Sequence, residues 1–388
     1  MFRHACRLAA VALLAAAVAA PARAEEKPPP AVDQAKVSAA VGRAADFLKA
    51  RVQEGLSSIS DVHPLHEGET YVELVLYALL TAGVPKDDPV VVKLVQDARA
   101  LPLAHTYATA IRAQAFEKFD PVKMSADIVQ CAQFLVDNQD REGHWGYSKA
   151  VPLDALPKLV FTGAPRAVAS GPGAVSAQPS PASGRATQVQ KRRTVARRAW
   201  GEGHDASNTQ YAMLGLTACM AGGIYPPDDV FGLVEKWLTD QQNEDGGWCY
   251  EHRGGSSYGS MTAGAVSTLG ICLGRRKLDP LKDVRVQKGL AWLGRNLDVS
   301  RNPGDPWGGK RFQYYWLYSV ERAGSLVGTS WFDQRPWYSE GAAALFASQA
   351  GDGSWAGIDG GYTLANTCWA VLFLQQASRH LRVVFSKS

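Results

Sequence analysis

Apolar side chains recur along most of the chain at the three- and four-residue spacing of a helix, and no stretch shows the strict alternation of a β-strand. Proline or glycine stands at the joints of this pattern, as at Pro85, Gly222 and Gly324, where we expect helices to begin or end. The predicted helices cover residues 34–53, 68–83, 89–100, 105–118, 125–139, 207–222, 228–241, 260–274, 283–297, 310–323, 336–349 and 363–378. The expected fold class is therefore all-α.

Two kinds of helix alternate in this pattern. Some are amphipathic, whereas residues 207–216, 260–269 and 365–374 start with small polar side chains and are then apolar on all sides. A helix that is apolar all round is buried. We therefore expect inner helices covered by amphipathic outer ones.

A short repeat marks the ends of several outer helices. A Gln is followed six residues later by a Trp, with an acidic residue and a Gly between them. The repeat positions are Gln139 and Trp145; Gln242, Asp245 and Trp248; and Gln349, Asp352 and Trp355. The Gln can bond exposed backbone groups, the Gly supplies positive φ, and the Trp covers the turn. This combination favours a structural clasp over a catalytic role.

The spacing of the repeat predicts how many units the chain holds. Degenerate copies fit the same frame around Phe47 and Trp292, and neighbouring units are about 50 residues apart. Six units of two helices each follow. Because one unit cannot bury its apolar face alone, the stack must continue or close. We expect it to close as an (α/α)6 toroid.

The first 24 residues have the features of an export signal. Arg3 and Arg7 precede an apolar run over residues 8–20, and small residues flank Arg23. Such a stretch is typical of a secretory signal peptide, with cleavage expected after Ala24 and a periplasmic or extracellular mature protein. An N-terminal membrane anchor is the alternative, although the run is shorter than the ~20 residues that span a bilayer. Residues 25–388 are expected to form a single toroid domain.

Charge argues against a nucleic-acid partner. The formal net charge of +4 comes from 41 Lys and Arg against 37 Asp and Glu residues. Without the three arginines of the expected signal, 38 basic residues face 37 acidic ones. Residues 148–206 break the helical pattern, are rich in Ala, Pro, Gly and Ser, and end in an arginine-rich stretch. They predict a mobile insertion, whose basic cluster is either a solvated loop or a surface for an anionic partner.

Cysteine and histidine spacing gives no metal or cofactor site. Five cysteines follow the expected signal, none of them in a Cys-x-x-Cys spacing, and we interpret them as buried small hydrophobes, with one disulfide as the alternative. His63 and His66 have the spacing of metal ligands, but no third ligand matches them.

The Gln-x2-Asp-Gly-x-Trp pattern resembles the QW motif of squalene and oxidosqualene cyclases. The predicted toroid resembles the fold that these cyclases share with protein prenyltransferase β subunits. The likeness extends to secreted bacterial prenyltransferase/squalene oxidase repeat proteins through residues 205–216, 316–324 and 337–345. It covers residues 34–378 apart from the insertion, and it implies the fold rather than a particular chemistry.

The residues that would carry the chemistry of those enzymes are missing. The cyclases protonate an alkene with an Asp-x-Asp-Asp acid, which this sequence does not contain. The prenyltransferases hold Zn²⁺ with Asp, Cys and His, and the corresponding positions here are Lys310, Phe312 and Asn366. The resemblance therefore predicts neither classical activity.

Polar and aromatic residues on the inner helices are the candidates for a site in a central cavity. The catalytic candidates are Glu73, Asp205 and Glu321. Glu73 could instead bond a neighbouring helix, and Asp205 could cap its own helix. Glu321 could form an ion pair with Arg322 at a helix end. The expected cavity-lining residues are Asn208, Gln210, Tyr211, Tyr314, Tyr315, Trp316, Asn366 and Trp369.

Two classes of function follow. The first is a binding or scaffold protein whose cavity holds an apolar or isoprenoid-like ligand, or whose faces hold a protein partner. The second is an enzyme, either a diverged terpenoid cyclase or transferase or a carbohydrate-active enzyme. The enzyme hypothesis predicts two carboxylates facing across the cavity, such as Glu73 and Glu321, and the binding hypothesis predicts no such pair.

Overall fold

A computed structural model describes residues 28–55, 71–103, 105–146, 187–192, 204–250, 253–306, 308–357 and 362–386. The expected signal over residues 1–24, most of the expected insertion over residues 148–206, and the pair His63 and His66 lie outside the described residues. Within the described part, regular structure consists of α-helices, one short 3-10 helix and four strands of two residues each. The all-α fold class is confirmed.

Helices of the described part form a closed inner ring. In it, α2 packs on α4, α4 on α6, α6 on α8, α8 on α10 and α10 on α12, and α12 returns to α2. The inner helices are α2 (Val72–Thr81), α4 (Thr106–Phe119), α6 (Ala206–Ala221), α8 (Gly259–Arg275), α10 (Gln313–Val327) and α12 (Thr363–Leu374). The contact between α12 and α2 closes the ring and makes the fold a toroid, as the repeat predicts.

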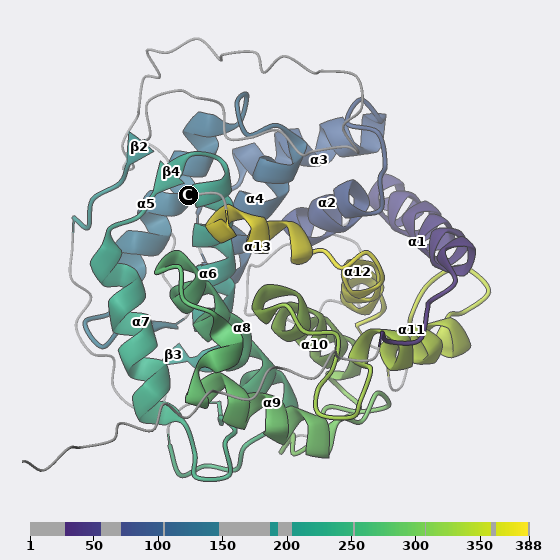
Figure 1. The fold of residues 1–388 in the computed structure, drawn as a ribbon. Coiled ribbons are helices and arrows are strands. Elements are labelled where there is room, and N and C mark those ends of the chain that lie inside the picture. Colours follow the sequence, from purple (N-terminus) through teal and green to yellow (C-terminus); the bar gives the residue numbers. More distant parts are fainter. Residues whose placement is uncertain are drawn as a thin grey trace, which may run out of the picture.

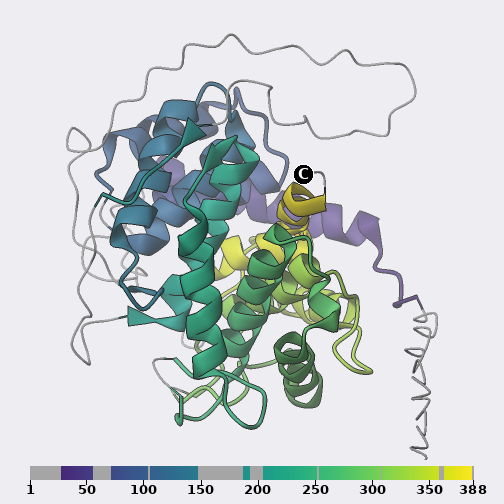
Figure 2. The ribbon, with the colours of Figure 1, turned by 60° about the vertical axis from the view of Figure 1, so that its left-hand side comes forward.

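The other helix of each pair lies outside the ring. There, α1 packs against α2 and α12, α5 against α4 and α6, and α11 against α10 and α12. The outer helices are α1 (Gln34–Glu54), α3 (Pro89–Ala100), α5 (Ser125–Asn138), α7 (Asp228–Gln241), α9 (Val284–Asn296) and α11 (Trp337–Ser348). Figure 1 shows them around the periphery of the ring, and Figure 2 shows the same two layers from another direction.

Burial follows the predicted division into inner and outer helices. Every residue of α2 is buried, and so are all residues of α6 and α10 except one in each. By contrast, α9 buries a single stripe that contains Val286, Trp292 and Leu293. No helix in the described ranges is long and apolar enough to cross a membrane.

Side chains at the helix starts explain where several outer helices begin. The Asp33 carboxylate accepts hydrogen bonds from the first backbone N–H groups of α1. Asp88 does the same for α3, directly before Pro89, and Asp283 does so for α9. Because these N–H groups have no partner within their own helix, the capping carboxylates stabilise the helix ends.

The C-terminal region differs from the prediction. We expected one helix over residues 363–378, but α12 ends at Leu374 and a further helix, α13 (Arg379–Ser386), follows. Gln376 has φ +48°, a left-handed conformation that interrupts the helix. The new helix packs on α6, α8 and α10, and Figure 1 shows it in yellow across the ring.

Helix α10 ends later than its glycine suggests. We expected Gly324 to end this helix, but α10 continues to Val327 and Gly328 adopts the left-handed C-cap conformation with φ 79°. Gly324 serves packing instead, because a Cβ there would lie 2.3 Å from the Trp337 ring.

Part of the expected insertion is packed on the ring. Strand β2 (Thr187–Gln188) pairs in parallel with β4 (Ile224–Tyr225), and the Gln133 amide donates to the Gln190 carbonyl oxygen at 2.6 Å. Arg192, from the basic cluster, forms an ion pair with Asp137 at 2.7 Å. Residues 187–192 are therefore docked against α5, contrary to the expectation of an excursion over the whole of residues 148–206.

Candidate functional site

The repeat glutamines connect neighbouring outer helices. Each side-chain amide donates one hydrogen bond to the carbonyl oxygen of the repeat glycine four residues later and a second to the next outer helix. The second acceptors are Val230 for Gln139 (2.9 Å), Arg285 for Gln242 (3.0 Å) and Ala40 for Gln349 (2.8 Å). The repeat clasps, residues 139–145, 242–248 and 349–355, thus tie α5 to α7, α7 to α9 and α11 to α1.

The repeat tryptophans connect each outer helix to the following inner helix. The indole N–H groups donate back to Leu135 from Trp145 (2.7 Å), to Leu238 from Trp248 (2.9 Å) and to Leu345 from Trp355 (2.9 Å). The backbone N–H groups of the same tryptophans donate to the hydroxyls of Thr209 (3.1 Å), Thr262 (3.0 Å) and Thr367 (3.0 Å). Sequence reasoning missed these threonines, although each lies near the small polar start of an inner helix.

The repeat glycines let the clasp approach the next outer helix. Gly143, Gly246 and Gly353 all have positive φ, at +104°, +92° and +89°. A Cβ at Gly353 would lie 2.4 Å from the Arg43 carbonyl oxygen, so only glycine fits there. Asp245 and Asp352 accept backbone N–H groups of their turns, from Gly247 and Ser354 respectively. The clasps have the geometry of structural joints.

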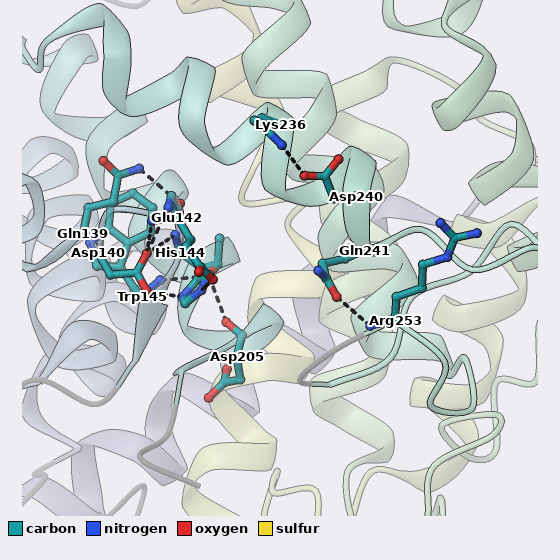
Figure 3. Close-up of polar contacts among 12 residues, drawn as sticks. Gln139, Asp140, Glu142, His144, Trp145, Asp205, Lys236, Asp240, Gln241 and Arg253 are labelled. Carbon is teal, nitrogen blue, oxygen red and sulfur yellow. Dashed lines mark hydrogen bonds and ion pairs between the residues drawn. The ribbon is translucent and has the colours of Figure 1, made fainter. Parts of the chain in front are cut away.

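The first clasp contains an additional buried histidine. His144 lies between Asp140 and Glu142, with N–O distances of 3.1 Å and 3.6 Å, and its ring packs on Trp237 with centroids 5.2 Å apart. Figure 3 shows His144 with Asp140 and Glu142, next to Trp145 and Asp205. No set of three His, Cys, Asp or Glu side chains within the described ranges is arranged to hold a metal ion.

Hydrogen-bonding side chains of three inner helices meet inside the ring. The Tyr315 hydroxyl on α10 bonds with Ser207 Oγ at 2.8 Å and accepts from Gln210 Nε2 at 2.7 Å, both on α6. The Tyr107 hydroxyl on α4 bonds with the same Ser207 and lies 3.4 Å from the Tyr315 hydroxyl. All four side chains are buried. Two of them, Tyr107 and Ser207, were not among the predicted lining residues.

Aromatic rings accompany this network. Tyr211 lies against Tyr107 with ring centroids 4.3 Å apart and stacks on Tyr315 at 6.2 Å. Trp369 meets Tyr315 edge-on at 5.3 Å. The structure thus brings together four of the predicted lining residues, Gln210, Tyr211, Tyr315 and Trp369, from three inner helices.

Arg322 completes this group, which we call the interior cluster. Its guanidinium carbon lies 4.3 Å from the Tyr318 ring centroid, 4.8 Å from that of Tyr211 and 5.6 Å from that of Tyr315. Its Nη2 donates to Gln210 Oε1 at 2.9 Å and to Ser319 Oγ at 2.7 Å. The interior cluster consists of Tyr107, Ser207, Gln210, Tyr211, Tyr315, Tyr318, Ser319 and Arg322.

The ion pair expected between Glu321 and Arg322 is not formed. Consecutive helical residues point in different directions, so Arg322 faces the interior cluster while Glu321 faces Ser325 and Ser378. The spacing of Tyr315, Tyr318 and Arg322, three and then four residues apart, places them on one helix face. That spacing is the sequence signal from which this part of the cluster could have been found.

Asp205 caps the helix that carries most of the cluster. Its carboxylate accepts from the Asn208 backbone N–H at 2.6 Å, from the Asn208 amide at 2.9 Å and from the Tyr250 hydroxyl at 2.8 Å. The side chain is fully buried, and burial raises its pKa to about 6 against the opposing effect of these bonds. The structure thus shows the capping geometry that we weighed against a catalytic role.

Glu73 is held in a buried ion pair. Its Oε1 lies 2.5 Å from Arg112 Nη2, and both side chains are at most 4% exposed. Arg112 also donates to the Leu101 carbonyl oxygen at 2.9 Å. Glu73 therefore fixes α2 to α4, which corresponds to the structural alternative that we considered for it.

Glu321 lies at the contact between α10 and the start of α13. Its Oε1 accepts from the Ser325 hydroxyl at 2.7 Å and from the Ser378 backbone N–H at 3.1 Å. Burial raises the pKa of this carboxyl to about 7, although the two serines favour its ionised form. Glu73 and Glu321 are thus each bonded to separate groups within the described part.

The other predicted lining residues are placed elsewhere. Trp316 donates its indole N–H to the Asp298 carbonyl oxygen at 2.9 Å, and the Tyr314 hydroxyl lies 3.4 Å from the Ala356 carbonyl oxygen. Both of them thus contact loops that lead into inner helices. Asn208 is bound to Asp205, and Asn366 is fully buried in the first turn of α12.

Comparison with known proteins gives no close relative. No protein-family model matches the chain, and no curated protein matches it. Among solved structures, the apo form of the type II terpene cyclase MstE from Scytonema is similar to it, with a TM-score of 0.48 and 10% sequence identity. That match covers 89% of this chain and 99% of the cyclase chain. The assignment of this chain as an all-α toroid rests on the closed ring of contacts between its own helices.

Proposed function

We propose that this chain is an exported binding protein, directed by the expected signal at residues 1–24, and that its ligand lies at the interior cluster. The observation that carries the proposal is the convergence of Tyr107, Tyr211 and Tyr315 with the amide of Gln210 inside one ring of helices. Binding sites for small molecules combine such aromatic walls with a few fixed polar groups.

The carboxylates favour binding over catalysis. An acid–base mechanism needs a carboxyl group within reach of the reacting atoms, usually opposite a second group. Glu73 is neutralised by Arg112, Asp205 caps α6, and Glu321 holds the start of α13. The enzyme hypothesis based on Glu73 and Glu321 therefore has less support than the binding hypothesis.

The cluster also indicates what kind of ligand fits. Tyrosine rings present flat apolar faces, and Trp369 adds a further apolar edge beside Tyr315. The hydroxyl of Ser207 and the amide of Gln210 can orient a polar end. We therefore expect a small ligand with an apolar body, of which an isoprenoid is one example.

Native mass spectrometry of the purified full chain tests the proposal. We expect the native mass to exceed the mass of the denatured chain by that of a bound small molecule, which denaturation releases. If no molecule co-purifies, we expect the chain to bind added farnesol, which serves as an apolar probe. Tyr315→Phe should weaken binding because it removes the hydroxyl that joins α6 to α10. Tyr338→Phe, in which the lost hydroxyl bonds Leu374 near the outside of the ring, is the matched control. A chain that binds neither a co-purifying molecule nor any added probe would contradict the proposal.

A further inference from the structure

Among the described residues, no carboxylate forms an ion pair with the buried Arg322. Its side chain is 0% exposed, and in the described part it donates to the neutral oxygens of Gln210 and Ser319, with the neutral Tyr211 hydroxyl as a further interacting group. An arginine is charged at any physiological pH. Removing an ion from water is costly, so a buried charge is normally paired with an opposite one.

Two other arginines of the fold, one buried and one partly buried, follow the normal pattern. Arg112 contacts the Glu73 carboxylate and two backbone carbonyl oxygens. Arg285 contacts the carboxylates of Asp283 and Glu235. Arg322 is more deeply buried than Arg285, yet within the described part its charge is met by neutral oxygens and by the faces of three tyrosine rings. A bound anion would give Arg322 the opposite charge that Arg112 and Arg285 already have.

The guanidinium also has unused donors. Nε and Nη1 of Arg322 are buried and have no acceptor in hydrogen-bonding geometry within the described part. The same is true of the indole N–H of Trp369, whose ring meets that of Tyr315 edge-on. Buried polar groups almost always form hydrogen bonds, so we expect these donors to bind an acceptor. Nε–H and Nη1–H point to different sides of the guanidinium, so one oxyanion can accept from only one of them. A charge-assisted bond from a guanidinium to a carboxylate or phosphate is stronger than a bond to a neutral acceptor.

We propose that the ligand of the interior cluster is an oxyanion, a carboxylate or a phosphate ester with an apolar or aromatic body, whose charged group accepts a hydrogen bond from Nε of Arg322. This inference rests on the proposed binding function and adds the charge of the ligand to it. Entry requires one of the enclosing rings to rotate. Tyr315 is 8% exposed, whereas Tyr211 and Tyr318 are each 1% exposed, so Tyr315 is the ring that we expect to move.

A pair of nearly isosteric probes tests the charge directly. Benzoate and benzyl alcohol share the ring, but only benzoate carries an oxyanion. We expect calorimetric titration of the full chain to give at least tenfold tighter binding of benzoate, because charge-assisted bonds to a guanidinium are about twice as strong as neutral ones. Phenyl phosphate, titrated in parallel, distinguishes a phosphate ester from a carboxylate as the preferred group.

Variants of Arg322 test the residue. Arg322→Gln should lose the preference for benzoate over benzyl alcohol. Arg322→Lys keeps the charge but not the Nε–H donor, so it should retain part of the preference. Arg275→Gln is the matched control, because Arg275 also lies over an aromatic ring, 4.4 Å from Phe231, but pairs with Asp228. It should bind both probes as the unmodified chain does.

A second readout does not depend on how well Arg322→Gln folds. In the unmodified chain, bound benzoate should shift the NMR signal of the Arg322 Nε–H downfield, and benzyl alcohol should not. Equal affinity for benzoate and benzyl alcohol, or a benzoate preference retained by a folded Arg322→Gln, would overturn the oxyanion inference alone. If farnesol, benzoate and phenyl phosphate all fail to bind, the proposed binding function falls with it.

Discussion

Gln349 donates a hydrogen bond of 2.8 Å to the carbonyl oxygen of Ala40, 309 residues earlier in the chain. The bond joins α11 of the last helix pair to α1 of the first. The same glutamine position joins consecutive pairs at Gln139 and Gln242. One local motif thus serves both to stack the repeats and to close them, which a linear array of repeats would not need.

Replacement of the closing glutamine should destabilise the chain. Gln349→Ala leaves the carbonyl oxygens of Gly353 and Ala40 without this donor, so we expect the free energy of unfolding in urea to fall by about 1–2 kcal/mol. Gln139→Ala should cost more, because Gln139 is fully buried. Gln287→Ala, on the exposed face of α9, is the control and should cost less than about 0.5 kcal/mol. Equal losses in all three variants would contradict the role of the clasp.

The threonine acceptors of the clasps can be tested by a pair of substitutions. Thr262→Val keeps the shape of the side chain but leaves the buried backbone N–H of Trp248 without an acceptor, so it should cost about 1–3 kcal/mol. Thr262→Ser keeps the hydroxyl and should cost clearly less. Thermal and urea denaturation of both variants give the comparison. If valine is tolerated as well as serine, the bond does not contribute to stability.

Two glycines of one turn should respond differently to a methyl group. Gly353→Ala places a Cβ 2.4 Å from the Arg43 carbonyl oxygen at φ +89°, so we expect a loss of about 2 kcal/mol or more in the free energy of unfolding. Gly351→Ala, two residues earlier, meets no atom within 4 Å and should change stability by less than about 0.5 kcal/mol. Similar stability of the two variants would show that the contact with α1 relaxes freely.

The ion pair between Glu73 and Arg112 should behave as a buried structural pair. Glu73→Gln leaves the Arg112 charge enclosed without a carboxylate, and we expect it to cost about 3–5 kcal/mol. The double variant Glu73→Leu with Arg112→Met removes both charges and should be more stable than the single variant. Urea unfolding of the unmodified chain, Glu73→Leu, Arg112→Met and the double variant measures the coupling. If the double variant loses as much free energy of unfolding as its two single variants lose together, the two residues are not coupled.

The ring of helices could be predicted because the sequence signals for each helix lie within that helix or next to it. Helical spacing, prolines at joints and the Gln-to-Trp repeat each lie within a few residues of the element that they describe. The short helix α13 escaped prediction for the opposite reason. The break before it occurs at Gln376, a non-glycine residue in a left-handed conformation, and glutamine carries no signal for that conformation.

The interior cluster could be predicted only in part. Inner-helix polarity pointed to Gln210, Tyr211 and Tyr315, but their partners come from distant segments. Tyr107 meets Ser207 across 100 residues of sequence, and Ser207 meets Tyr315 across 108. We expected Arg322 to form an ion pair with Glu321, its neighbour in sequence, although adjacent residues of a helix face different ways. Helix face, rather than proximity along the chain, decides such pairings.

The contact between Glu321 and the start of α13 should make stability depend on pH. Burial raises the pKa of Glu321 to about 7 in the folded chain, whereas an unfolded glutamate titrates near ~4.3. Between these values the folded chain keeps a proton that the unfolded chain releases. Stability is therefore highest below the unfolded pKa and falls as pH rises through about 7. One pKa unit corresponds to about 1.4 kcal/mol, so the upper limit of the loss is about 3–4 kcal/mol.

Glu321→Gln should remove this part of the pH dependence. The amide stays neutral at every pH, so the loss of unfolding free energy between pH 5 and pH 8 should be about 2–3 kcal/mol smaller than in the unmodified chain. Asp205, whose pKa burial raises to about 6, acts in the same direction and leaves a residual slope. Glu54→Gln, at an exposed position of α1, is the control and should leave the profile unchanged. Parallel profiles for Glu321→Gln and the unmodified chain would show that Glu321 ionises in the folded state at little cost, and the anchoring of α13 through Ser378 would then be independent of pH.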